Sequence, residues 1–276
     1  YAEGADCPTY IPMGTKGLLT LMWQDSVKIF NQEQERFGWT PLYTQDDAGV
    51  ALKHIVECEL YDRIRLNDNV NFTYINAQHI VGARQVFMEY YDKVRMYRIG
   101  FTGDISNYKS RYWLDDLDML PRCDMVVGEC TYANSSREYY STSRQKDLDK
   151  LDSSLSFIIE KKSKIILPTF SLNRLQDVLA MLYEHFDGRA PVKILVDTPL
   201  GISINQIWDK LIKKDFELWK KIKNWEDVYF ITDFKDSIHF SKIQEPMIVI
   251  AGGGMLSGGR ARFWCKECMG NAHNAI

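Results

Sequence analysis

The second half of the chain, from about residue 141, alternates short apolar runs with longer helical segments. Runs this short and this apolar indicate buried strands, and the segments between them are long enough for helices. Strands that alternate with helices in this way predict a mainly parallel sheet with helices on both faces. The expected strands are 164–170, 192–199, 228–232 and 246–254, and the expected helices are 145–162, 172–186 and a helical stretch through about residue 225.

The first half has a different pattern. Residues 15–37 carry apolar side chains at helical spacing and are followed by Gly38, which predicts an amphipathic helix. A second helix is expected over 44–58, with Thr44 as its N-cap. Alternating runs rich in β-branched and aromatic residues then predict antiparallel strands. These are 63–66, 70–77, 85–91 and 95–103, and a further strand is expected at the start of 125–132. The change of pattern predicts two domains, 1–135 and 136–276.

Composition narrows the classes of function. The 276 residues carry a net charge of −3, which argues against binding of nucleic acid through bulk surface charge. A polyanion would therefore need local donors inside a cleft. No apolar run approaches the length of a membrane span, so no membrane partner is expected. The six cysteines lack the spacing of a secreted disulfide scaffold, which favours a reducing cytoplasm. Cys265 and Cys268 form a single C-x-x-C without a second pair, so a zinc knuckle is not favoured.

Several expected strands end in polar or glycine-rich loops, where ligands collect in open α/β sheets. Residues 252–259 hold five glycines, a composition that lets backbone N–H groups approach an anion. Arg260 follows directly and could bind phosphate through its guanidinium, although a tight strand-to-helix turn is the competing interpretation. Arg174, in the first turn of a helix, is either an anion ligand or a plain solvated arginine. Glu129 ends an apolar strand, which suits a site better than a surface.

The histidines are ambiguous when they are taken one at a time. His79 stands among small and apolar neighbours in "NAQHIVGA", and Asp104 follows Thr102 and Gly103 in "FTGDIS". Spacing alone does not make these two residues metal ligands rather than a core histidine and a turn aspartate. The remaining candidates, His54, His185 and His239, are expected to be structural.

Taken in order, the motifs resemble those of one known family. The segments "FTYINAQHIVGA", "FTGDIS" and "GECTYANSSRE" are similar to the "AGHILGSA", "FTGDIG" and "ESTYG" segments of the β-CASP branch of the metallo-β-lactamase-fold nucleases. "LPTFSLNRLQDVLAML", "VKILVDTPLGISI" and "VIAGGGMLSGGR" resemble its "PAFALGRTQELLYIL", "PVYVDSPLA" and "IASSGMCTGGR". "YIPMGTKGLLTLMWQDSVKI" resembles its "TPAT…LLEDSLKI" helix, so that the likeness runs from about residue 9 to 264. This branch includes the ribonucleases J and the pre-mRNA cleavage endonuclease.

The resemblance implies an α/β protein in which a partial αββα metallo-β-lactamase sandwich carries an inserted β-CASP domain. It also implies hydrolysis of a phosphodiester by two zinc ions, with His79 and Asp104 as metal ligands and Asp104 and Glu129 as catalytic residues. The expected substrate is RNA, single-stranded by preference, and the expected assembly is a homodimer or a processing complex. The residues that match the family's phosphate-holding wall are Ser171, Arg174, Thr198, Gly252, Gly253, Gly254, Ser257, Gly258, Gly259 and Arg260.

Departures from the family pattern leave alternatives open. Its H-x-H-x-D-H signature and its two C-terminal histidine motifs have no counterpart here, and Gly252 and Gly253 stand where the family often has serine. Either the chain is the central part of a longer active enzyme, which we favour, or it is a scaffold that has lost its metal site and binds RNA or assembles a complex. A DNA nuclease of the repair branch is a third reading and differs in substrate only.

Overall fold

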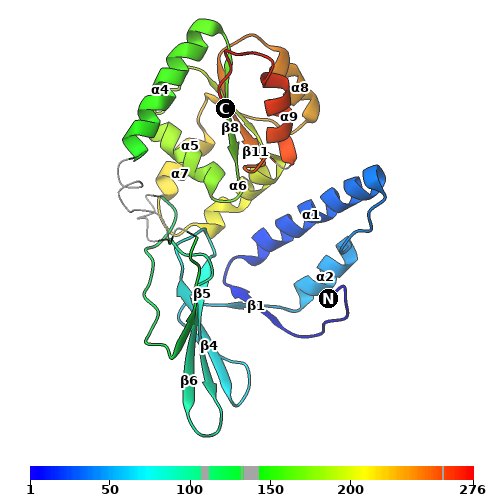
Figure 1. Ribbon diagram of the computed structural model, residues 1–276, viewed down its shortest axis with the longest axis vertical. Helices are drawn as coiled ribbons and strands as arrows, with labels where there is room; N and C mark the ends of the chain where they lie inside the picture. Colours follow the sequence, from blue (N-terminus) through cyan, green and yellow to red (C-terminus); the bar gives the residue numbers. More distant parts are fainter. Residues whose placement is uncertain (107–111, 132, 134–142, 257) are drawn as a thin grey trace. The chain divides into compact units, whose positions relative to one another are not determined.

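The computed structural model describes residues 1–276 except 107–111, 132, 134–142 and 257. The chain divides into two compact units, the first made of residues 1–130 with 207–215 and the second of residues 131–206 with 216–276. The predicted boundary between residues 135 and 136 lies outside the described residues. Each unit contains its own sheet and helices (Figure 1).

Two helices begin the first unit. The predicted first helix is confirmed as α1 (Lys16–Phe37), and Gly38 ends it in the left-handed conformation at φ 74°. The second, α2 (Gln45–Lys53), starts at Thr44, whose side chain accepts from the Asp47 backbone N–H while the Asp47 carboxylate accepts from the Thr44 backbone N–H. This reciprocal arrangement is a capping box, and it confirms Thr44 as the N-cap.

The second helix is shorter than predicted. It ends at Lys53, and the following residues form the strand β2 (Ile55–Cys58). This strand pairs in parallel with β1 (Thr9–Pro12), with Ile55 opposite Thr9. The prediction of a helix over 44–58 was therefore wrong at its C-terminal end. The β-branched pair Ile55–Val56 favours a strand once a partner strand is available, and that partner lies far back in the sequence.

A five-stranded sheet forms the rest of the first unit, in the order β3-β4-β5-β6-β7. The predicted antiparallel run is confirmed, because β3 to β6 pair as antiparallel neighbours, whereas β7 runs parallel to β6. Met88, Ile99 and Met125 stand opposite one another in this register and so share one face of the sheet. The strands are β3 (Arg63–Arg65), β4 (Val70–Asn76), β5 (Arg84–Tyr91), β6 (Met96–Phe101) and β7 (Met125–Val127).

The second unit is built on a parallel sheet of four strands in the order β10-β9-β11-β8, as the alternating pattern predicts. Both faces of β11 are buried, since all six of its residues are inaccessible, and helices lie on both sides of the sheet (Figure 1). The strands are β8 (Lys164–Thr169), β9 (Lys193–Asp197), β10 (Val228–Phe230) and β11 (Met247–Gly252). The helices are α4 (Ser143–Lys161), α5 (Arg174–His185), α7 (Phe216–Lys223), α8 (Phe234–Lys242) and α9 (Gly259–Cys268). The helix α6 (Pro199–Leu211) begins in this unit, and its residues from 207 onward belong to the first unit.

The C-x-x-C pair lies in the core of this unit. Cys265 and Cys268, on α9, pack with Trp264 against Ile166 and Val249 of the sheet. Burial raises the pKa of both thiols, which keeps them protonated and suits apolar packing. No helix in the described part of the chain is long and apolar enough to cross a membrane.

Candidate functional site

Three predicted site residues of the first unit lie together at the ends of three different strands. His79 follows β4, Asp104 follows β6, and Glu129 follows β7. The His79 Nε2 atom is 3.9 Å from Asp104 Oδ2, and both side chains are accessible, by 36% and 73% respectively. Residues separated by 25 positions in the sequence therefore meet at one open edge of the five-stranded sheet.

Backbone contacts hold the two loops in this arrangement. The Ser106 N–H donates to the Ala77 carbonyl over 3.1 Å, which ties the loop of Asp104 to the loop of His79. Gln78, between Ala77 and His79, is buried at a positive φ of 55°, and its Oε1 accepts from the Leu117 N–H. A residue with a bulky side chain rarely adopts this conformation, so its contacts fix the direction in which His79 leaves the strand.

Glu129 is hydrogen-bonded to the backbone of the loop that carries Asp104. Its Oε1 accepts a hydrogen bond of 2.7 Å from the Ile105 N–H, directly after Asp104. Its own N–H donates to the hydroxyl of Thr102, which in turn donates to the Gly103 carbonyl. Gly103 has a positive φ of 54°, a value that favours glycine. Glu129 is thereby fixed beside the turn that presents Asp104.

The fit of this arrangement to zinc can be tested by distance. Bonds to zinc from histidine nitrogen and carboxylate oxygen are about 2.1 Å long, so two ligands of one tetrahedral ion lie about 3.4 Å apart. His79 Nε2 and Asp104 Oδ2 are 3.9 Å apart, and a side-chain movement of about 0.5 Å brings them to that spacing. A complete site needs about four ligands, and no group of three or more His, Cys, Asp or Glu side chains that could hold a metal is found among the described residues. The pair fits part of a metal shell and does not fill it.

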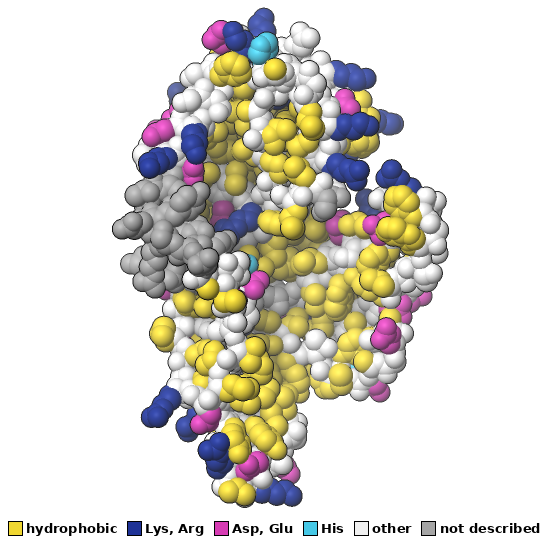
Figure 2. All heavy atoms as spheres, in the orientation of Figure 1, with side chains coloured by type: hydrophobic (Ala, Val, Ile, Leu, Met, Phe, Trp, Pro, Cys, Tyr) yellow, Lys and Arg dark blue, Asp and Glu magenta, His cyan; other side chains and the backbone are white. Residues whose placement is uncertain are grey.

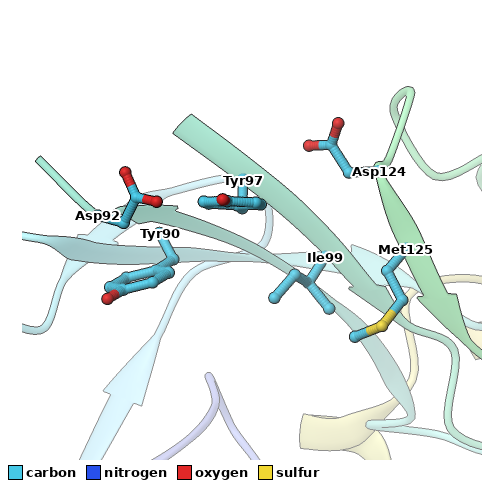
Figure 3. A pocket seen from close by; sticks show the side chains of 6 residues that line it. All are labelled: Tyr90, Asp92, Tyr97, Ile99, Asp124 and Met125. Atoms are coloured by element: carbon cyan, nitrogen blue, oxygen red, sulfur yellow. The ribbon is translucent and has the colours of Figure 1, made fainter. Parts of the chain in front are cut away.

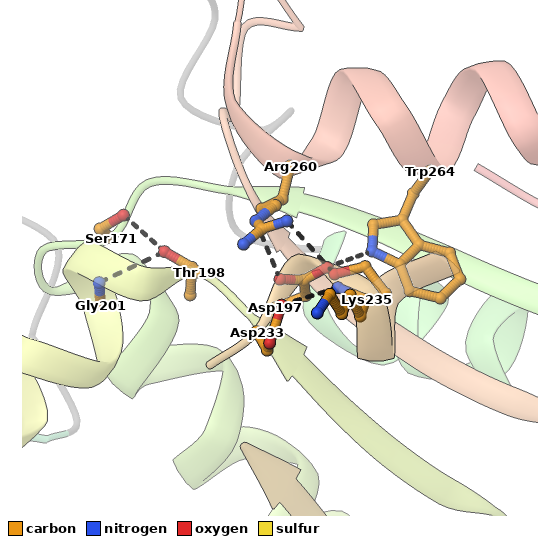
Figure 4. A network of polar contacts seen from close by, with 9 residues as sticks. Ser171, Asp197, Thr198, Gly201, Asp233, Lys235, Arg260 and Trp264 are labelled. Atoms are coloured by element: carbon orange, nitrogen blue, oxygen red, sulfur yellow. Dashed lines mark hydrogen bonds and ion pairs between the residues drawn. The ribbon is translucent and has the colours of Figure 1, made fainter. Parts of the chain in front are cut away.

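The predicted phosphate-binding residues belong to the second unit and gather at the carboxyl ends of β8, β9 and β11. Ser171 Oγ and Thr198 Oγ1 are hydrogen-bonded at 2.8 Å, and Thr198 also accepts from the Gly201 N–H (Figure 4). Thr198 is buried, with 1% of its surface exposed, whereas Ser171 is half-buried. Of this pair, Ser171 is the hydroxyl that solvent reaches, and Thr198 holds it in place.

The glycine loop, residues 252–259 without the undescribed residue 257, packs tightly against these strand ends. A Cβ at Gly252 would come within 2.6 Å of Thr198 Oγ1, and one at Gly253 within 2.3 Å of the Gly258 carbonyl. Gly253 and Gly259 also have positive φ values, of 115° and 70°. The loop therefore needs glycine for close backbone approach and for conformation. Ser257, predicted as a further phosphate ligand, lies outside the described residues.

The two predicted arginines lie beside carboxylates. Arg174 is 56% exposed at the start of α5, and its Nη1 is 3.6 Å from Asp177 Oδ2. The Arg260 side chain is only 18% exposed, and its Nε is 3.4 Å from Asp197 Oδ1 (Figure 4). Its guanidinium lies over the Phe234 ring. Sequence reasoning did not single out Asp197. A lone aspartate at the end of the apolar run "VKILVD" is a sequence signal for a buried carboxylate that needs a cationic partner.

A separate hollow of about 400 Å³ lies at the other end of β5 from His79. The rings of Tyr90 and Tyr97 line it, with their centroids 6.2 Å apart, and Asp92 and Asp124 stand at its margin (Figure 3). Arg95 lies over the Tyr97 ring at 4.1 Å, so the hollow has both cationic and anionic side chains beside it. Its place at the far end of β5 makes the hollow distinct from the predicted site.

Comparison with known proteins gives consistent matches. Residues 175–276 match the family model described as the Beta-Casp domain. Ribonuclease TTHA0252 of Thermus thermophilus is 24% identical over 283 residues, covering 100% of this chain and 62% of that protein. Transcription termination factor FttA of Thermococcus kodakarensis is 25% identical over 289 residues, covering 98% and 42%. Integrator complex subunit 11 of Danio rerio is 25% identical over 283 residues, covering 99% and 44%. The chain spans about half the length of the curated relatives it matches.

Proposed function

We propose, on the premise that this chain belongs to the β-CASP family of metallo-β-lactamase-fold nucleases, that the protein is a metal-dependent phosphodiester hydrolase acting on RNA. The family assignment makes nuclease chemistry the first expectation. RNA is favoured over DNA because one of the relatives is named as a ribonuclease. Zinc is the proposed metal, since histidine nitrogen and carboxylate oxygen are both ordinary zinc ligands.

The convergence of His79, Asp104 and Glu129 at one sheet edge carries this proposal. The histidine and the aspartate are 3.9 Å apart, and Glu129 holds the backbone next to the aspartate. A hydrogen bond that fixes the loop of Asp104 suits a metal site, because outer residues that orient the ligands set the affinity for the ion.

In this proposal the chain's own residues have three roles. His79 and Asp104 would supply two ligands, and bound zinc would supply the activated water and charge stabilisation of a hydrolase. Glu129 positions the Asp104 loop through the Ile105 N–H. Ser171, held by Thr198, would contact a backbone phosphate of the substrate.

We also propose residues 1–135 as the metallo-β-lactamase-like part and 136–276 as the β-CASP domain. An αββα sandwich for the first part is supported by the open face of its five-stranded sheet. Met125 on this face is 52% exposed beside Ile99 and Met88. A second sheet or layer packed on this face would remove these apolar side chains from water.

The test uses the full-length protein. Zinc content is measured by elemental analysis, and cleavage of a labelled RNA is measured with and without a chelator. Wild-type protein should contain zinc and cleave RNA, and chelation or Asp104→Ala should abolish cleavage. Asp236→Ala is the matched control, because Asp236 is an exposed aspartate on α8 with no predicted role. Unchanged cleavage in Asp104→Ala would refute the proposal.

A metal-free scaffold is the second candidate, and one observation favours it: no complete group of metal ligands is found in the described ranges. The scaffold predicts RNA or partner binding that is indifferent to chelator and to Asp104→Ala. Competition between RNA and DNA of the same sequence separates the remaining alternative, a DNA nuclease, because only RNA carries the 2′-hydroxyl.

A further inference from the structure

Phe170 occupies an unusual position beside the predicted phosphate-holding loops. It directly follows β8, in which Thr169 is only 5% exposed, yet Phe170 itself is 55% exposed. Its backbone is nevertheless fixed, because its carbonyl accepts from the Leu175 N–H and the Thr169 carbonyl accepts from the Gly253 N–H. The chain thus holds a large aromatic side chain toward solvent at a well-defined point.

The glycine loop closes one side of this residue. A Cβ at Gly254 would lie 3.3 Å from Cδ2, Cε2 and the backbone nitrogen of Phe170. Glycine at this position therefore lets the loop backbone lie directly against the ring. With one side of the residue packed on the loop and more than half of its surface open, the ring has the form of a platform.

The platform lies next to the Ser171–Thr198 hydroxyl pair. Gly252 packs on Thr198, and Gly254, two residues further on, packs on Phe170. One short segment therefore lines both features, and Ser171 follows Phe170 in the chain. A ligand that spans them would present a flat apolar group to the ring and a polar acceptor to the Ser171 hydroxyl. A nucleotide has both.

Charge in this unit is compatible with a nucleic acid. Residues 131–206 and 216–276 contain 18 Lys and Arg against 16 Asp and Glu, whereas the first unit contains 16 against 21. The basic side chains of the second unit are spread over the visible face rather than gathered in one stripe (Figure 2). Base stacking would add a contribution to RNA binding beside the electrostatic one.

We propose that Phe170 is a stacking platform for a nucleobase of a single-stranded RNA, with the adjacent backbone held at Ser171. This inference rests on the proposed function and extends it from phosphate contact to base contact. Bases stack on aromatic side chains without strong sequence preference because every base has a π-face. Loss of one such contact lowers affinity by about 5- to 150-fold. The platform therefore favours unpaired strands over duplexes, in which the bases are already stacked.

The experiment measures binding of full-length protein to a fluorescein-labelled oligouridine by anisotropy, and quenching of an oligonucleotide that contains 2-aminopurine. Phe170→Ala should weaken binding by about 5- to 150-fold and remove the quenching. Phe170→Trp should retain both. Phe170→Leu keeps apolar surface without a π-face and should behave like Phe170→Ala. Tyr229→Ala is the matched control, because Tyr229 is an aromatic residue, 45% exposed, on the edge strand β10 of the same sheet.

The possible outcomes separate failure of the stacking platform from failure of the proposed function. Wild-type affinity and quenching in Phe170→Leu would show that the contact with RNA needs no aromatic ring, and would refute the platform. Wild-type RNA binding by Phe170→Ala would also refute it while leaving the proposed function intact. Failure of the wild-type protein to bind RNA would refute the proposed function and the platform together.

Discussion

The indole Nε1 of Trp264 donates a hydrogen bond of 2.7 Å to Oδ2 of Asp197, and both residues are fully buried. The other carboxylate oxygen, Oδ1, faces Arg260 Nε at 3.4 Å. A buried carboxylate at the end of β9 is thus compensated by an indole and a guanidinium from one helix, α9 (Figure 4). Arg260 links α9 to β9, so a phosphate contact at Arg260 would have to use the nitrogens that Asp197 leaves available.

Trp264→Phe should destabilise the second unit. The substitution keeps most of the apolar volume but removes the only donor that the indole supplies, leaving Asp197 Oδ2 without that bond. We expect a loss of about 1–3 kcal/mol in the free energy of unfolding, measured by urea denaturation. Trp39→Phe is the control, because Trp39 is 60% exposed and should change stability by less than about 0.5 kcal/mol. Equal stability of the two variants would contradict a stabilising role for the bond.

Glu129→Ala should weaken metal binding although Glu129 is not a predicted ligand. Removal of the carboxylate frees the Ile105 N–H and loosens the turn that presents Asp104. Outer residues of this kind typically change metal affinity by about 10- to 100-fold. The measurement is zinc titration of the full-length protein against a competing chelator.

Glu129→Gln tests the cause of that effect, because the amide oxygen can still accept from Ile105 but carries no charge. A smaller loss than in Glu129→Ala would assign the effect to positioning. Glu35→Ala, at an exposed position on α1, serves as the control. Unchanged zinc affinity in Glu129→Ala would remove Glu129 from the proposed site.

Periodicity was sufficient to predict the parallel sheet and the antiparallel run. Both are local patterns, in which each strand or helix carries its own apolar spacing. The strand β2 was missed because its pairing with β1 joins Ile55 to Thr9, and no local pattern records that partner. Sequence patterns therefore predict individual helices and strands better than they predict which strands, far apart in the sequence, pair with each other.

The candidate site likewise depends on contacts between residues that are far apart in the sequence. His79 and Asp104 were selected through motif resemblance, but only the fold brings them to 3.9 Å. The roles of Asp197 and Phe170 depend on burial and on backbone approach, as at Gly254, which sequence spacing does not express. Arg260 was expected to face a ligand, whereas its partner Asp197 is 63 positions away in the sequence.

The capping box of α2 should make stability depend on pH. Asp47 Oδ2 accepts from both the N–H and the hydroxyl of Thr44, and these bonds lower the pKa of Asp47 from its ordinary value of 3.8. A lowered pKa in the folded state means that the contribution is present above pH 3.8 and is lost as the pH falls through the folded value. Thr44→Ala should therefore be less stable than wild type at pH 7, and the difference should shrink below about pH 4. Thermal unfolding at several pH values measures it, and a difference that grows on acidification would contradict the assignment.

Gly253→Ala should disrupt the glycine loop, whereas Gly258→Ala, in the same loop, should be tolerated. Gly253 has a φ of 115° and its Cβ would lie 2.3 Å from the Gly258 carbonyl, so alanine meets both strain and backbone overlap. Gly258 has extended backbone with a φ of −166°, and nothing lies within 4 Å of its Cβ position. We expect Gly253→Ala to cost roughly 1–3 kcal/mol. Urea unfolding of the two variants gives the comparison, and equal stabilities would show that the loop does not require glycine at residue 253.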